Sequence, residues 1–260
     1  MTHPDIHFEL RGDEQEVAVI RLARSAKRNA LSDSLILALR DIFETLPKSV
    51  RAAVIDGEGP HFCAGLDLSE LQERDAGQGL HHSRMWHAAL ERVQFGPVPV
   101  IAALHGAVVG GGLELASACH IRVADASTFY ALPEGSRGIF VGGGGSVRIP
   151  KLIGAARMAD MMLTGRVYDA QDGERIGLAQ YLVPEGQAFD KDCALALRVA
   201  QNAPLTNYAL IHALPRIAEQ PADQGYFTEA MMAAIAQSAP EAKQRLADFL
   251  EGRAAKVSKQ

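Results

Sequence analysis

The chain has 260 residues, of which 48% are hydrophobic and 22% are charged. This balance is ordinary for a globular protein and excludes a disordered or collagen-like chain. The formal net charge is −5, so the protein as a whole does not attract nucleic acid. The three cysteines have no CxxC spacing and predict neither a disulfide framework nor a metal site. Together with a polar N-terminal segment that lacks signal-peptide features, they favour a cytoplasmic protein.

The segment 93–113 lacks Asp, Glu, Lys and Arg and has the length of a membrane-spanning helix. However, Gly96, Pro97 and a run of three glycines would interrupt a helix there and leave backbone groups unpaired in lipid. We therefore expect a buried strand followed by a buried loop, and no association with a membrane.

Apolar, partly β-branched runs predict strands at 17–22, 52–56, 98–104 and 121–124. Between the first two, Ser32 can cap a helix that carries Leu35, Leu39 and Ile42 at helical spacing and stops before Pro47. From Lys151 onward the pattern is mainly helical, with helices expected at 155–164, 170–176, 187–202, 206–219, 225–237 and 241–253. Buried strands that alternate with helices predict an α/β fold with covered sheets.

Seven of the 24 glycines form two runs, 110–112 and 142–145. Neither run has the spacing of a dinucleotide-binding or phosphate-binding loop. The first run follows a predicted strand and begins an apolar helix, so the N–H groups of Gly111 and Gly112 would point out of the helix N-terminus. For the second run, the sequence suggests tight turns but gives no reason for four glycines.

Two glutamates lie within apolar, glycine-rich sequence. Glu114 falls in the first turn of the helix after the first glycine run, where it could stabilise the helix dipole or serve as an acid or base. Glu134 follows a proline and could be a simple turn residue. Because apolar surroundings raise the pKa of a carboxyl group, the pair could also exchange protons with a substrate.

A third segment, at 60–71, follows the predicted strand 52–56. Its Ala64–Gly65 turn leads into an expected helix start, which would present the backbone N–H of Leu66. Together with the N–H of Gly111, this donor could polarise one carbonyl oxygen.

These segments resemble the signature regions of the enoyl-CoA hydratase (crotonase) superfamily: AGLDLSEL at 64–71, PVIAALHGAVVGGGLELA at 99–116 and LPEGSRGIF at 132–140. The resemblance extends to KRNAL at 27–31, MADMMLTGR at 158–166 and ERIGLAQYLV at 174–183. SRGIFVGGGGSVRIP at 136–150 is particularly similar to hydratases of methylthioacryloyl-CoA. The resemblance implies a crotonase-type ββα spiral core over 1–200 and, within the same structural unit, a C-terminal helical region over 201–260 that mediates trimerisation.

The resemblance also implies an activity, the addition of water across the 2,3 double bond of a short 2-enoyl-CoA such as methylthioacryloyl-CoA. Glu114 would activate the water and Glu134 would deliver a proton to Cα, while the N–H groups of Leu66 and Gly111 hold the thioester oxygen. Coenzyme A would be part of the substrate, with no separate cofactor. Thioester hydrolysis, an isomerase and a non-catalytic relative that binds CoA or RNA remain alternatives.

The resemblance assigns seven residues to coenzyme A binding: Ala26, Lys27, Arg28, Ala30, Ala64, Asp67 and Leu68. It implies a homotrimer or a homohexamer built as a dimer of trimers, in which the region of Phe249 and Lys256 completes the CoA site of an adjacent subunit. The sequence departs from the family at Val141, where proline is common, so the shape of the acyl pocket stays open.

Three histidines, His81, His82 and His87, lie near Trp86. They lack the HExxH spacing of a metal site. We expect them on a helix near the acyl end of the pocket.

Overall fold

A computed structural model describes residues 3–70 and 73–253. The chain divides into two compact units, Met1–Ala200 and Gln201–Gln260. Leu71, the last residue of the segment AGLDLSEL, and Lys256 lie outside the described residues. Within the described ranges, every helix is too short or too polar to span a lipid bilayer.

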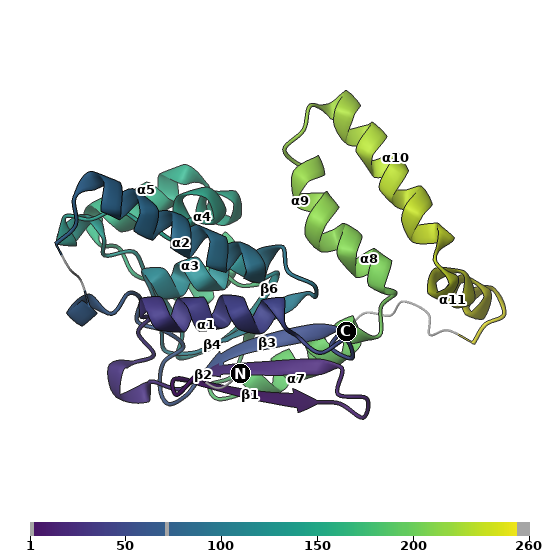
Figure 1. Cartoon of the computed structure of the whole chain (residues 1–260), viewed down its shortest axis with the longest axis horizontal. Helices are drawn as coiled ribbons and strands as arrows, with labels where there is room; N and C mark the ends of the chain where they lie inside the picture. The colour runs from purple at the N-terminus through teal and green to yellow at the C-terminus, as the bar shows by residue number, and fades with distance from the viewer. Residues whose placement is uncertain (1–2, 71–72, 254–260) are drawn as a thin grey trace. The chain divides into compact units, whose positions relative to one another are not determined.

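The first unit contains a six-stranded sheet in the order β1-β2-β3-β4-β6-β9 (Figure 1). The strands are β1 (Ile6–Arg11), β2 (Val17–Leu22), β3 (Ala52–Gly57), β4 (Val100–Leu104), β6 (Ile121–Asp125) and β9 (Tyr181–Val183). β1 pairs antiparallel with β2, and the other neighbours are parallel. All four predicted strands are confirmed, although β4 begins two residues later than expected.

Helices cover both faces of this sheet. Successive side chains of a strand point to opposite sides, so each strand contributes side chains to the packing on both faces. Ile20, Ile55 and Ala102 belong to a buried cluster with side chains of three helices: α1 (Asp33–Glu44), α2 (Ala76–Gln94) and α3 (Gly111–Ala118). Figure 1 labels these three helices and the strands of the sheet. Val19 and Val54 belong to a second cluster with α7 (Ala188–Ala200). The apolar strands thus bury both faces, which confirms the covered α/β architecture.

The N-termini of α1 and α2 are capped by side chains. Ser32 Oγ accepts a hydrogen bond from the backbone N–H of Leu35 at 3.2 Å, as the sequence predicts, and α1 ends at Glu44 before Pro47. Asp75 and Gln78 form a reciprocal capping box at the start of α2. Such caps satisfy N–H groups that have no partner inside the helix, so both helix starts are well defined.

A smaller sheet contains β5 (Ala107–Val109), β7 (Phe129–Ala131) and β8 (Tyr168–Asp169). The remaining helices of the unit are α4 (Gly145–Ile153), α5 (Ala155–Thr164) and α6 (Ala170–Ile176). α5 and α6 have the predicted bounds. The three short strands were not predicted from the sequence, because two or three residues are too few to show an alternating pattern.

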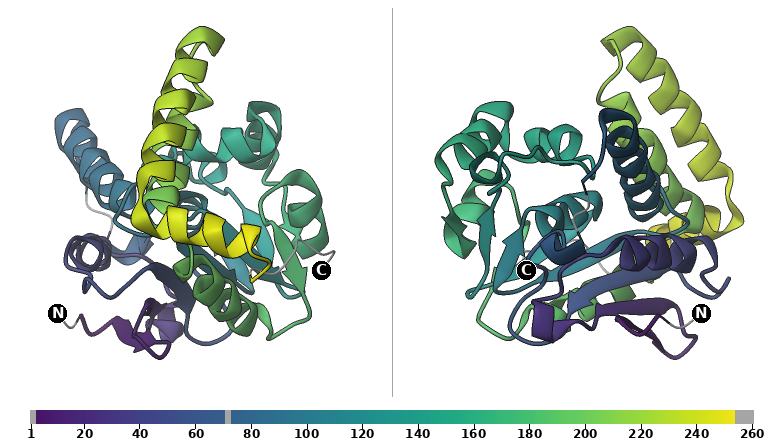
Figure 2. Two further views of the ribbon diagram at one scale, coloured as in Figure 1. Left: turned by 90° about the vertical axis from the view of Figure 1, so that its right-hand side faces the viewer. Right: turned by 60° about the vertical axis from the view of Figure 1, so that its left-hand side comes forward.

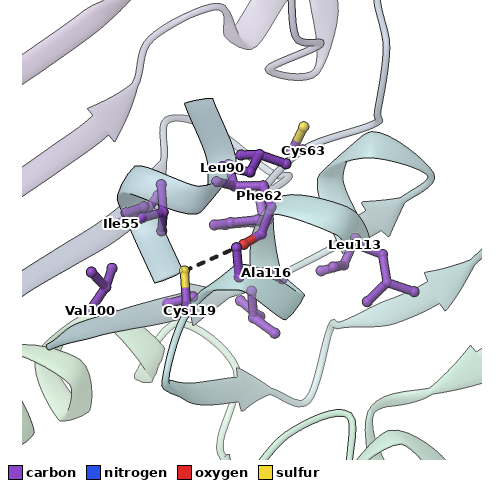
Figure 3. Close-up of a cluster of buried hydrophobic side chains, with 14 of the residues drawn as sticks. Ile55, Phe62, Cys63, Leu90, Val100, Leu113, Ala116 and Cys119 are labelled. Carbon is purple, nitrogen blue, oxygen red and sulfur yellow. Dashed lines mark hydrogen bonds between the residues drawn. The ribbon is translucent and has the colours of Figure 1, made fainter. Parts of the chain in front are cut away.

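Helix α3 lies in the centre of the core, and all eight of its residues are buried. Figure 3 shows Leu113 and Ala116 among the buried side chains of Phe62 and Leu90. The Cys119 thiol follows α3 and donates a hydrogen bond to the carbonyl of Leu115 at 3.5 Å. Since the core packs around α3, the residues at its start are held firmly.

The second unit is helical, as expected. It contains α8 (Pro204–Tyr208), a π-helical segment η4 (Ala209–Ala213), α9 (Leu214–Ile217), α10 (Ala222–Ser238) and α11 (Pro240–Leu250). α10 runs back alongside α8 and α9 (Figure 2). The single helix predicted at 206–219 is wrong in detail, because Pro215 has no N–H to donate and the helix is divided into three segments.

Candidate active site

Three neighbouring parallel segments lead into the site, and two of them are strands of the small sheet. Cys63 forms a parallel bridge with Val108, and Val108 pairs in parallel with Tyr130. The chains that leave neighbouring parallel strands start side by side. Leu66 and Gly111 each lie three residues beyond the Cys63–Val108 bridge, and Glu134 lies four residues beyond Tyr130.

The two predicted backbone donors are neighbours. A β-carbon placed on Gly111 would lie 3.3 Å from the N atom of Leu66, and one placed on Gly65 would lie 3.2 Å from the N atom of Gly111. Neither N–H donates a hydrogen bond to another residue within 3–70 and 73–253. Two adjacent N–H groups that donate to no described residue can together bind a carbonyl oxygen or an oxyanion.

The local structure at Leu66 differs from the expected helix start. The N–H of Leu31 donates to the carbonyl of Gly65 at 2.7 Å, and the N–H of Asp67 donates to the carbonyl of Leu31 at 2.8 Å. Leu66 is therefore held in an extended bridge. Only a three-residue 3-10 helix, η2 (Leu68–Glu70), follows.

Glu114 projects from the first turn of α3 and is almost completely buried, at 4% exposure. Its Oε1 accepts hydrogen bonds from the N–H groups of Gly143 and Gly145, each at 2.8 Å. Burial raises the pKa of this carboxyl group and the nearby charge of Glu134 raises it further, although the two N–H donors act in the opposite direction. The result is a fixed carboxyl group that ionises less readily than an exposed one.

The second glycine run forms the cradle of Glu114. A β-carbon on Gly145 would lie 2.8 Å from Glu114 Cγ, and one on Gly143 would lie 3.2 Å from Glu114 Oε2. Gly144 has a φ of +96° and leaves space for the Arg148 guanidinium, which donates to the Gly143 carbonyl at 2.8 Å. Three of the four glycines therefore allow the backbone to approach Glu114 and Arg148 closely.

Glu134 occupies a different environment at the start of η3 (Gly135–Arg137). Its Oε1 approaches within 2.8 Å of the position that a β-carbon on Gly110 would occupy. Its Oε2 is buried and accepts no hydrogen bond from any described residue. Burial raises the pKa of this carboxyl group, which favours the protonated form.

All four predicted catalytic residues line one pocket of about 380 Å³. Leu66 and Gly111 contribute backbone, and Glu114 and Glu134 contribute carboxyl groups. The remaining wall is largely apolar and includes Ile139, Phe140 and Val141. A pocket of this kind, apolar with a few convergent polar groups, is typical of a small-molecule site.

Helix α2 forms a further wall of the pocket. Gly79, His82, Ser83 and Trp86 line it, and their spacing places them on one face of the helix. Asp33 of α1 fixes this face, because its Oδ1 accepts hydrogen bonds from His82 Nε2 at 2.7 Å and from Trp86 Nε1 at 2.9 Å. Burial raises the pKa of Asp33, but these two hydrogen bonds outweigh it and leave the pKa below the ordinary value.

The residues assigned to coenzyme A lie in two adjoining segments, residues 24–31 and 63–68. The N–H of Ala64 donates to the carbonyl of Arg28 at 2.9 Å. Lys27 Nζ donates to Asp67 Oδ2 at 2.8 Å, and this hydrogen bond, with one from Ser69, holds the pKa of Asp67 well below its usual range. Much of the Lys27 charge is therefore balanced within the protein.

The loop between η1 (Ser25–Lys27) and α1 has an unusual backbone. Arg28 and Asn29 have positive φ angles of 53° and 56°, a strained conformation that functional loops often contain. The buried Asn29 side chain stabilises it, donating to the carbonyls of Glu58 at 2.9 Å and His61 at 2.7 Å. Neither the strain nor the role of Asn29 was evident from the sequence.

The sequence model of the enoyl-CoA hydratase/isomerase family matches residues 12–260. The chain belongs to the enoyl-CoA hydratase/isomerase family. It is 30% identical to 2,3-dehydroadipyl-CoA hydratase of Escherichia coli, over 92% of this chain and 94% of that protein. It is also 27% identical to the enoyl-CoA hydratase EchA19 of Mycobacterium tuberculosis, over 96% of this chain and 95% of that protein.

Solved structures of the family confirm the crotonase fold. A candidate enoyl-CoA hydratase from Rhodopseudomonas palustris has 58% identity and a TM-score of 0.93, with 97% of both chains covered. An enoyl-CoA hydratase from Bacillus anthracis has 30% identity and a TM-score of 0.88, over 96% of this chain and 97% of that one. The spiral core that the sequence motifs imply is thus the fold of this family member.

Within the described part of this crotonase fold, no three His, Cys, Asp or Glu side chains gather as metal ligands would. The histidines near Trp86 lie on α2, as the sequence predicts, and His82 reaches the pocket. Its partner Asp33 was missed, because the contact joins residues 49 positions apart.

Proposed function

We propose that the protein is a hydratase that adds water across the 2,3 double bond of a short 2-enoyl-CoA. The observation that carries the proposal is that two carboxyl groups and two N–H groups without an acceptor among the described residues lie in one pocket. Relatives named as enoyl-CoA hydratases support the reaction class. Methylthioacryloyl is the acyl group that the sequence motifs favour.

In the proposed reaction, the N–H groups of Leu66 and Gly111 bind the thioester oxygen. Negative charge develops on this oxygen as water adds to C3, and donors fixed in advance stabilise that charge. Glu114 holds the attacking water and accepts its proton. Glu134 delivers a proton to C2, so that one water molecule is added in total. Because both carboxyl groups handle one water, their titrations are coupled.

The experiment that tests the proposal follows the loss of enoyl-thioester absorbance with crotonyl-CoA. Glu114→Ala and Glu134→Ala are each expected to lower the rate of hydration at least about 100-fold, the lower end of general acid-base contributions. Near-normal turnover by either variant would contradict its assigned role.

Free thiol measured in parallel detects thioester hydrolysis, which the same water and oxyanion site could support. Double-bond migration without addition of water would instead indicate an isomerase. No turnover of any enoyl-CoA would favour a non-catalytic relative that binds CoA or RNA.

The proposal includes a homotrimer or a hexamer of two trimers, and a cytoplasmic location. Exposed apolar side chains on α10, such as Tyr226, Phe227 and Met231, support an assembly, because large exposed apolar patches are characteristic of interfaces. Light scattering after size-exclusion chromatography measures the subunit number, and a monomer would contradict this part of the proposal.

A further inference from the structure

The pocket lining contains two arginines, Arg74 and Arg137, as well as the two glutamates. A guanidinium group stays charged at any physiological pH. The lining therefore carries two permanent positive charges, although a neutral enoyl group needs none.

Asp33 holds Arg74 beside the pocket without using its hydrogen-bond donors. Arg74 Nη2 lies 3.6 Å from Asp33 Oδ2, which is close enough for charge attraction but too far for a hydrogen bond. The other oxygen of Asp33 is engaged by His82 and Trp86. Among the described residues, the Arg74 side chain donates no hydrogen bond, so its planar N–H groups remain available to a ligand.

The position of Arg74 relative to the oxyanion donors follows from α2. The indole of Trp86 packs against Gly111, since its Cζ3 lies 3.5 Å from the place of a Gly111 β-carbon. His82 is one helical turn away, or about 5.4 Å along the axis. Because Asp33 contacts both His82 and Arg74, the guanidinium lies near the His82 end of this wall. A chain that extends along α2 from the oxyanion donors therefore approaches Arg74.

We propose that the pocket accepts a second class of substrate, 2-enoyl thioesters whose acyl chain ends in a carboxylate, and that Arg74 binds this carboxylate. A guanidinium pairs with a carboxylate through two parallel hydrogen bonds. The apolar residues Ile139 and Val141, which also line the pocket, suit the carbon chain between the two ends. The inference rests on the proposed hydratase function.

The experiment compares two thioesters of equal chain length, those of 2-hexenoic and 2-hexenedioic acid, by their kcat/KM for hydration. The wild-type protein is expected to prefer the diacid at least about tenfold, the contribution of one hydrogen bond to a charged group. Arg74→Gln keeps a polar side chain but removes the charged guanidinium, so it is expected to abolish the preference. The ratio of two substrates on one preparation is unaffected by a loss of folded protein.

Arg92→Gln is the matched control. Arg92 lies on α2 and, like Arg74, pairs with a carboxylate of α1, that of Glu44 at 3.0 Å, but it does not line the pocket. The control is expected to keep the wild-type ratio. The assignment to Arg74 is overturned if Arg74→Gln keeps the ratio, or if Arg137→Gln alone abolishes it.

Two further outcomes separate this inference from the proposed function. Hydration of crotonyl-CoA and 2-hexenoyl-CoA without any preference for the diacid overturns the second substrate class and leaves the hydratase intact. Failure to hydrate any of the three thioesters refutes the hydratase itself.

Discussion

The two carboxyl groups of the pocket occupy opposite environments. Glu114 lies at the start of α3, and one of its oxygens accepts two backbone hydrogen bonds from the second glycine run. Glu134 lies in the loop before η3, and its buried Oε2 has no hydrogen-bond partner among the described residues. Burial raises the pKa of both groups, but only Glu114 is held in one orientation by donors.

The difference indicates how one pocket can separate two proton-transfer tasks. Donors on Glu114 stabilise its ionised form and leave Oε2 to accept a proton from water. Without donors, the carboxyl group of Glu134 is easier to protonate, which suits delivery of a proton. This contrast depends on a few glycines, so single substitutions can break it.

The largest expected effect comes from Gly145→Ala. The added β-carbon would lie 2.8 Å from Glu114 Cγ and would displace the carboxyl group. A shift of about 1 Å can lower a rate about 100-fold, and we expect a loss of kcat for crotonyl-CoA hydration of this order.

Gly142→Ala is the control within the same run. The nearest atom to its added β-carbon is Ser83 Oγ at 3.8 Å, which is an ordinary contact. We expect kcat to stay within about twofold of the wild-type value, because the geometry of Glu114 is preserved. Equal losses in Gly142→Ala and Gly145→Ala would mean that the run acts only through backbone flexibility.

A smaller effect is expected from Gly110→Ala, on the Glu134 side. Gly110 has a φ of +53°, and an added β-carbon would lie 2.8 Å from Glu134 Oε1. Strain of this kind costs about 1–3 kcal/mol, so urea denaturation should show a lower free energy of unfolding. Gly138 also has a positive φ, of +67°, with nothing within 4 Å of an added β-carbon. Gly138→Ala should therefore cost less than Gly110→Ala.

The smallest expected effect is a gain of stability in Glu134→Gln. Burial raises the pKa of Glu134 in the folded state, so the folded protein retains a proton that the unfolded chain releases as pH rises. Stability is therefore lost as pH rises from the ordinary carboxyl pKa through the raised one. The variant avoids this loss and should be more stable than the wild type at neutral pH.

Thermal melts at several pH values measure this gain. The advantage of Glu134→Gln should disappear below the ordinary carboxyl pKa, where both states are protonated. Glu114→Gln should gain less, because the hydrogen bonds from Gly143 and Gly145 already favour the charged form. A larger gain in Glu114→Gln would reverse the contrast between the two glutamates.

The sequence predicted β2, β3, β4 and β6 and the candidate residues of the site, since apolar patterns and motif spacing are local, but it did not predict β1. It did not predict β5 and β7, although their pairing places Gly110 beside the segment before Glu134. It also gave no partner for the second glycine run. Gly143 and Gly145 are 29 and 31 residues from Glu114, and only the folded chain brings them together.

The same limit applies to Asp33. In the sequence it is the first residue of a capped helix, where a carboxylate stabilises the helix dipole. Its hydrogen bonds to His82 and Trp86 join two helices whose packing no local pattern defines. This wall of the pocket therefore depends on tertiary packing that the local sequence does not define.

The bridge between Leu31 and Leu66 sets the direction of the first oxyanion donor, the backbone N–H of Leu66. In a parallel bridge, Leu31 bonds to the residues on either side of Leu66, so the N–H of Leu66 points away from Leu31. A shift of pairing by one residue would turn that N–H to the other side. The direction of the donor is thus determined by strand register, and a different side chain at position 66 would leave it in place.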